Sequence, residues 1–198
     1  VDQANYQTIL IKCEDRVLTL TLNRPGQLNA VNGTMHEELS RVFTDAAHDP
    51  DSDIIVLTGA GRAFCAGGDI DWMQDAVDNP LSFERTAVEG KQIIFSLLDC
   101  EKPVVAKVNG AAVGLGATLA LFCDIIFAVD HAKFADPHVR VGLVAGDGGA
   151  VIWPQLIGYA RAKEYLMTGD SMTGREAMEI GLINHAVSEG ELNNVTAE

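Results

Sequence analysis

The sequence has few basic side chains: 14 Lys and Arg stand against 28 Asp and Glu, a formal net charge of −14 over 198 residues. The basic residues form no cluster, which nucleic-acid backbones and anionic membrane surfaces both require, so we expect neither as a partner. No apolar stretch reaches the ~18 residues of a membrane-spanning helix. The first residues also lack the positive and hydrophobic regions of a secretory signal peptide.

Cysteine is scarce as well. Cys13, Cys65, Cys100 and Cys123 form no CxxC pair and have no histidine at a spacing suited to zinc. We expect each of them to be a reduced cysteine in the protein core. We therefore expect a cytoplasmic protein without a metal site.

What remains is an ordinary globular composition, 47% hydrophobic and 21% charged, at a length that fits one domain. Apolar strand patterns at 17–22, 53–58, 103–108 and 123–128 alternate with helix patterns at about 34–46, 81–99 and 147–181. Thr34 is the expected N-cap of the first helix. This alternation indicates the α/β class, with mixed or parallel strand pairing.

Three glycine clusters, at 59–68, 114–116 and 146–149, need a separate explanation. None fits a P-loop, and the Gly-x-Gly at 114–116 lacks the remainder of a dinucleotide fingerprint. Two of the clusters lie between a strand and a helix, where backbone N–H groups are left without intrahelical acceptors. They either form an oxyanion hole of two N–H donors or serve only turns and close packing.

Several short motifs occur in a fixed order from about residue 6 to about 188. They are Leu22-Asn-Arg-Pro25, Leu28-Asn-Ala30, Ala63-Phe-Cys-Ala-Gly-Gly-Asp-Ile70, Lys102-Pro-Val-Val-Ala106, Asn109-Gly110, Cys123-Asp124 and Phe134-Ala-Asp-Pro137. In this order they resemble the crotonase family, the enoyl-CoA hydratase/isomerase group.

The resemblance implies a spiral of ββα units, a homotrimer or hexamer, and an acyl-CoA thioester as substrate. It implies no cofactor, because coenzyme A enters as part of the substrate. Residues 1–190 would form the acyl-CoA-binding core, and 191–198 would begin a C-terminal helical region that is truncated or absent.

The resemblance also implies the roles of individual residues. The backbone N–H groups of Gly68 and Leu115 correspond to the two oxyanion donors of the family. Ala66 corresponds to a residue whose carbonyl holds the adenine ring, and Asp69 and Ile70 continue that wall.

The sequence departs from the family where hydratases carry two catalytic glutamates. The corresponding positions are Thr118, which we assign to substrate binding, and His138. Threonine is no base near neutral pH, whereas histidine takes and gives protons there. His138 either has this acid–base role or only bonds a backbone carbonyl near the end of a strand. Asp147 either shares this acid–base role or is the N-cap of the following helix.

The neighbours of these residues carry further expectations. Asp136 and Arg140 flank His138 and could tune its protonation. Among the other candidates, Trp72 and Met73 either line an acyl pocket or pack in the core, and the core is favoured. His36, Glu84 and Glu89 are expected on solvated helix faces.

Taken together, the sequence predicts an enzyme of the enoyl-CoA hydratase/isomerase group that stabilises an enolate in an oxyanion hole. His138, with Asp147, would move the protons in place of two glutamates. The alternative is a catalytically silent acyl-CoA-binding or assembly protein that has kept the hole and lost the acids.

Overall fold

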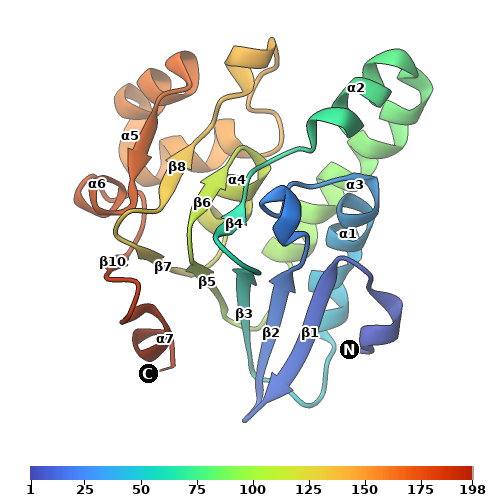
Figure 1. The fold of residues 1–198 in the computed structure, drawn as a ribbon, viewed down its shortest axis with the longest axis vertical. Coiled ribbons are helices and arrows are strands. Elements are labelled where there is room, and N and C mark those ends of the chain that lie inside the picture. Colours follow the sequence, from blue (N-terminus) through green and yellow to red (C-terminus); the bar gives the residue numbers. More distant parts are fainter. Residues whose placement is uncertain (198) are drawn as a thin grey trace.

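Two sheets organise the chain in the computed structural model, which describes residues 1–197, with the backbone alone at 80–83. The larger sheet has the order β1-β2-β3-β5-β7-β10 (Figure 1). Its strands are β1 (Ile9–Glu14), β2 (Val17–Leu22), β3 (Ile54–Gly59), β5 (Val104–Val108), β7 (Ile125–Val129) and β10 (His185–Val187). All neighbours pair in parallel except β1 and β2.

The β1–β2 hairpin turns through Asp15 and Arg16, which both have positive φ (49° and 66°), while Glu14 pairs with Val17. Two left-handed residues suit the right-handed twist of a two-residue hairpin turn. The alternation of threonine and leucine in β2 gives one buried and one half-buried face, as the sequence predicts.

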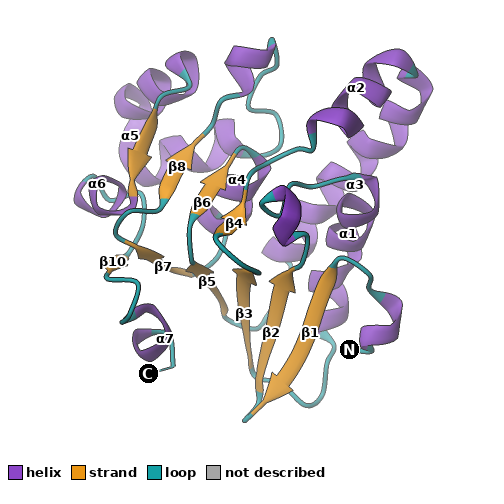
Figure 2. Cartoon of the chain, in the orientation of Figure 1, coloured by secondary structure: helices purple, strands orange, loops and turns teal. Residues whose placement is uncertain are grey.

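The smaller sheet has the order β4-β6-β8-β9 (Figure 2). It contains β4 (Ala63–Cys65), β6 (Ala111–Val113), β8 (Lys133–Ala135) and β9 (Ser171–Thr173). The first three strands run parallel, and β9 pairs antiparallel to β8. Each of β3, β5 and β7 lies in the large sheet and is followed by a short strand in the small sheet and then by a helix. This repeated ββα order confirms the expected α/β class.

Helices cover both sheets. They are α1 (Gly33–Ala47), α2 (Ile70–Asp78), α3 (Pro80–Leu98), α4 (Leu115–Leu121), α5 (Gly149–Thr168), α6 (Gly174–Glu179) and α7 (Leu192–Val195). Short 3₁₀ turns are η1 (Gln3–Asn5), η2 (Pro25–Gln27) and η3 (His138–Val141). Helices α1 and α3 pack together against the large sheet (Figure 1), where Phe43, Leu57 and Ile93 are fully buried.

The sequence predicts only some of the helix caps correctly. The capping box of Thr173 and Glu176 at the start of α6 is confirmed. The expectation that Thr34 caps α1 is wrong, because the Asn32 side chain accepts a hydrogen bond from the backbone N–H of Met35 at 3.0 Å and α1 begins at Gly33. Asparagine is as good an N-cap as threonine, and Asn32 directly precedes the first turn of α1, where the N–H groups lack intrahelical acceptors.

Among residues 1–197, none of the helices combines the length and the apolarity needed to span a bilayer.

The four cysteines are all free, but only Cys65 and Cys123 are buried. The expectation of a core position is wrong for Cys13, which is exposed, and only partly right for Cys100. Cys13 lies in β1, the outermost strand of the large sheet, which no further strand covers.

Candidate active site

The parallel strands β4, β6 and β8 place the candidate residues at one edge of the small sheet. Gly68 follows β4 by three residues, Leu115 follows β6 by two, and His138 follows β8 by three. Carboxyl ends of neighbouring parallel strands meet at one edge, which is where α/β proteins place their ligands. Three segments that are distant in the sequence are therefore brought side by side.

The two glycine-rich turns touch each other. A methyl group on Gly67 would lie 2.8 Å from the carbonyl oxygen of Val113, and one on Gly116 would lie 2.4 Å from that of Cys65. Gly67 and Gly114 also have positive φ (91° and 54°), which favours glycine. The turns approach this closely because they lack side chains.

The N–H groups of Gly68 and Leu115 have no acceptor within residues 1–197. Gly68 forms a parallel bridge with Val31, whose N–H donates to Gly67 and whose carbonyl accepts from Asp69. In such a bridge the N–H of the central residue, Gly68, is directed away from the partner strand. Leu115 is the first residue of α4, so its N–H has no intrahelical acceptor.

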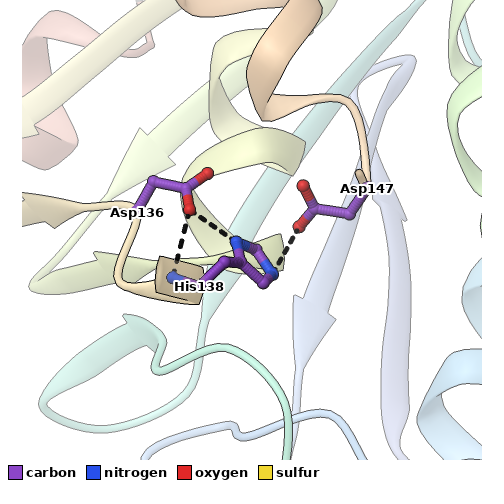
Figure 3. Close-up of side chains that lie close together, drawn as sticks. All are labelled: Asp136, His138 and Asp147. Carbon is purple, nitrogen blue, oxygen red and sulfur yellow. Dashed lines mark hydrogen bonds and ion pairs between the residues drawn. The ribbon is translucent and has the colours of Figure 1, made fainter. Parts of the chain in front are cut away.

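His138 lies between two carboxylates (Figure 3). Its Nδ1 is 2.5 Å from Oδ1 of Asp136, and its Nε2 is 3.6 Å from Oδ2 of Asp147. The side chain of Asp136 is 0% exposed, against 20% for His138 and 18% for Asp147. The ring also touches the second glycine turn, because a methyl group on Gly114 would lie 3.7 Å from its Cε1.

Asp147 connects this histidine to α4. Its Oδ1 accepts hydrogen bonds from the Thr118 hydroxyl and from the Gly149 N–H, both at 3.2 Å. The residue that caps α5 is Gly148, so the reading of Asp147 as the N-cap residue is wrong. Thr118 and His138, where the resemblance implies glutamates, thus both contact Asp147.

The surroundings shift both ionisable groups toward their protonated forms. The hydrogen bond to Asp136 raises the pKa of His138 above its ordinary value, and the charges of Asp147 and Asp136 add to this while burial opposes it. Burial raises the pKa of the Asp147 carboxyl, and the positive charge of His138 opposes that shift. Each of the two side chains therefore keeps its proton to a higher pH than it would in water.

Asp136, His138 and Asp147 are the one group of potential metal ligands that the described residues form, with ligand atoms within 4.8 Å of one another. Nδ1 of His138 is already bonded to Asp136, so a cation between His138 and Asp147 would have only two protein ligands from this group. Zinc sites commonly use three or four. The geometry favours acid–base chemistry.

The residues expected along the adenine wall lie at the start of α2. Asp69 is the N-cap of α2 and forms a 2.9 Å ion pair with Arg24, which lowers the pKa of the Asp69 carboxyl. Ile70 is 77% exposed, and Ala66 is half-buried with its N–H bonded to the carbonyl of Leu28.

Some neighbouring expectations are wrong. His36 and Glu89 are not solvated but buried, with Nδ1 of His36 2.9 Å from Oε2 of Glu89. The sequence carried a signal for this, because His36 lies three residues before Leu39 and seven before Phe43, on the apolar face of α1. The half-buried ring of Trp72 lies against His36, at 5.1 Å between centroids, rather than in the core.

Two further expectations concern side chains near the site. Met73 is also half-buried, and a methyl group on Gly68 would lie 3.1 Å from its sulfur. The guanidinium of Arg140 donates to Asp170 at 2.9 Å and is not hydrogen-bonded to His138 in the described residues.

Comparison with known proteins decides the family. Residues 12–198 match the family model described as Enoyl-CoA hydratase/isomerase. The chain belongs to the enoyl-CoA hydratase/isomerase family. Among its relatives, the crotonyl-CoA hydratase of Syntrophomonas wolfei is 36% identical over 94% of this chain and 72% of its own length. The 1,2-epoxyphenylacetyl-CoA isomerase of Escherichia coli is 38% identical over 93% and 71%.

A solved member of the family has the same fold. The crystal structure of an enoyl-CoA hydratase/isomerase from Mycobacterium paratuberculosis matches with a TM-score of 0.92 and 39% identity, covering 97% of this chain and 78% of that one. Family membership and fold are therefore secure on both sequence and structure.

Proposed function

We propose that the protein is an enzyme acting on an acyl-CoA thioester, with Gly68 and Leu115 as oxyanion donors and His138 and Asp147 as the acid–base pair. The observation that carries this proposal is the position of the His138 ring, which lies against the Gly114 turn and 3.6 Å from Asp147. Relatives named as a hydratase and as an isomerase of CoA thioesters support the substrate class.

The oxyanion donors lower the barrier to forming an enolate. Removing a proton next to a thioester carbonyl places negative charge on the carbonyl oxygen, and two N–H groups directed at that oxygen stabilise the charge. One such donor is commonly worth a factor of ~10²–10³ in rate. Backbone donors can provide this effect whatever the side chain, so glycine and leucine serve equally.

The proton carriers follow from the same geometry. Nε2 of His138 is free of Asp136 and faces Asp147, so it is the atom that takes a proton from the substrate. Asp147 has a raised pKa because it is buried, which suits a carboxyl that gives a proton back at another carbon. The pair would move a proton from one position of the enolate to another.

Ordinary hydration by two glutamates is disfavoured. In this chain Thr118 occupies one of those positions, and its hydroxyl donates to Asp147 at 3.2 Å. A threonine cannot activate water near neutral pH. Proton shuttling, as in an isomerase or in an unusual hydratase or hydrolase, fits the residues better.

The test is exchange of the α-proton of butyryl-CoA in D₂O, followed by mass spectrometry, alongside hydration of crotonyl-CoA. General acid–base groups contribute ~10²–10⁴-fold, so His138→Ala should slow exchange at least 100-fold. His131→Ala is the matched control, because His131 is exposed and paired with Asp130. Hydration at an ordinary hydratase rate that is unchanged in His138→Ala would overturn the assignment.

A second function, a silent acyl-CoA-binding or assembly protein, is favoured by the absence of a carboxylate at both usual positions. Calorimetry with butyryl-CoA and crotonyl-CoA separates it from the enzyme. Binding without exchange or turnover would support the silent protein. Failure to bind either thioester would contradict both functions.

A further inference from the structure

Asp136 is a fully buried carboxylate with an incomplete set of partners. Its Oδ1 accepts hydrogen bonds from Nδ1 of His138 at 2.5 Å and from the His138 backbone N–H at 3.4 Å (Figure 3). Its Oδ2 is buried and has no hydrogen-bond partner among the described residues. Burial of an unpaired ionised carboxylate is costly, so nearby positive charge must offset the cost.

The start of α5 supplies part of that charge. A methyl group on Gly149, the first residue of α5, would lie 2.3 Å from Oδ2 of Asp136, so the carboxylate lies against the helix N-terminus. The first N–H groups of the helix have other acceptors, because Gly149 donates to Asp147 and Ala150 to the carbonyl of Ala145, so what acts on Asp136 here is the dipole of the helix. A helix N-terminus favours an anion, and more strongly at a buried position than at an exposed one. This helix end and the His138 ring are therefore the neighbours that offset burial of the Asp136 carboxylate.

The Asp136 side chain determines which ring nitrogen of His138 carries a hydrogen, because its Oδ1 accepts from the His138 backbone N–H and lies 2.5 Å from Nδ1. A carboxylate only accepts hydrogen bonds, so Nδ1 must be the donor. In the neutral ring Nε2 is then the acceptor, and it is the nitrogen that faces Asp147.

We infer that Asp136 is a positioning residue, which fixes the tautomer and orientation of His138 so that Nε2 exchanges the proton. This inference rests on the proposed function for its catalytic consequence. Its structural part, the state of the His138 ring, stands independently.

The groups facing His138 are few, which makes a pH test clean. Asp136 faces it from the segment after β8, and Asp147 from the loop before α5. Thr118 of α4 and the turns at Gly67 and Gly114 add no ionisable group. Arg140, on the same 3₁₀ turn as His138, is directed to Asp170.

The experiment compares wild type with Asp136→Asn, which keeps the size of the side chain and removes its charge. Histidine ¹⁵N spectra recorded against pH give the tautomer and the titration midpoint of His138, identified by the signal missing in His138→Ala. Loss of an adjacent carboxylate should lower the midpoint by about one pH unit and increase the other tautomer. Asp53→Asn is the control, because Asp53 is exposed and paired with Arg16 in a surface ion pair.

Kinetics provide the second readout. In Asp136→Asn, kcat for α-proton exchange should fall by about 10–100-fold with KM for butyryl-CoA nearly unchanged. The limb of the kcat/KM profile that rises with pH should move to lower pH with the NMR midpoint. If Asp136→Asn does not fold, Gly149→Ala displaces the carboxylate from the other side and should change the same tautomer signal.

The outcomes separate the two proposals. An unchanged tautomer and midpoint in Asp136→Asn would overturn the inference, whatever the activity. If the midpoint changes in Asp136→Asn but His138→Ala still exchanges the α-proton at the wild-type rate, the structural part is supported and the proposed function is overturned. A changed midpoint with unchanged kcat in Asp136→Asn would overturn the catalytic part.

Discussion

The close approach of the two glycine turns can be tested by Gly116→Ala. A methyl group there would lie 2.4 Å from the carbonyl oxygen and 2.7 Å from Cβ of Cys65, about 1 Å inside ordinary contact. The obstacle is backbone and a buried Cβ, so it cannot rotate away. Helix α4 must therefore move from β4 by several tenths of an ångström or more, and the N–H of Leu115 moves with it.

Two energies combine in this variant. Overpacking costs about 1–3 kcal/mol, whereas alanine is better than glycine inside a helix by about 1 kcal/mol. The net loss of unfolding free energy should be about 0–2 kcal/mol, or a melting temperature lower by up to about 8 °C for a domain of this size. Displacing one oxyanion donor should lower kcat/KM for α-proton exchange by ~10²–10³.

The assay pairs thermal unfolding, followed by circular dichroism, with exchange measured well below the melting temperature. Gly26→Ala is the matched control, since a methyl group there has no atom within 4 Å and the backbone is not left-handed. If Gly116→Ala exchanges the α-proton at the wild-type rate, whatever its stability, the close contact between the two glycine turns does not position the Leu115 N–H, and the reasoning is refuted.

Three further predictions follow from single side chains. Because burial raises the pKa of Asp147 above its unfolded value, the stability tied to it is complete below about pH 3.9 and is lost as pH rises through the raised pKa. Asp147→Asn should therefore keep or gain up to about 1 kcal/mol in urea unfolding at pH 8 while exchange activity falls at least 100-fold; a large loss of stability would contradict this. Asp69 has the opposite sign: Arg24 lowers its pKa, so its contribution is present above about pH 3.9 and lost as pH falls through the lowered value. Asp69→Asn should cost about 1–2 kcal/mol at pH 7 and little near pH 2, by urea unfolding at both pH values. Trp153 is 0% exposed and its indole N–H has no partner among the described residues, so Trp153→Phe should change the unfolding free energy by less than about 1.5 kcal/mol, whereas Trp153→Ala should cost about 3–5.

Local patterns predicted much of the fold because their physical causes are local. The alternation in 17–22 fixes which face of β2 is buried, and the Thr173–Glu176 pair satisfies N–H groups within one turn. The N-cap of α1 could not be chosen in the same way, since Asn32 and Thr34 are both good caps and only the path of the preceding chain selects between them.

The buried pair of His36 and Glu89 shows the limit of this reasoning. The sequence places His36 on the apolar face of α1, but it does not show which residue is the partner of this ring. Only the packing of α1 on α3 removes both from water and makes each the partner that the other needs.

The sequence by itself determined the α/β class, the positions of the glycine turns, and the presence of threonine and histidine at 118 and 138, because composition, period and motif order are properties of the chain. Only the tertiary structure decided that Asp136, His138 and Asp147 form one cluster, beside turns that end two other strands. The reason is geometric: the carboxyl ends of β4, β6 and β8 meet at one edge, and their alignment depends on strand order and register. A residue's chemistry can be read from its type, but its partners are set by what the fold places within hydrogen-bonding distance.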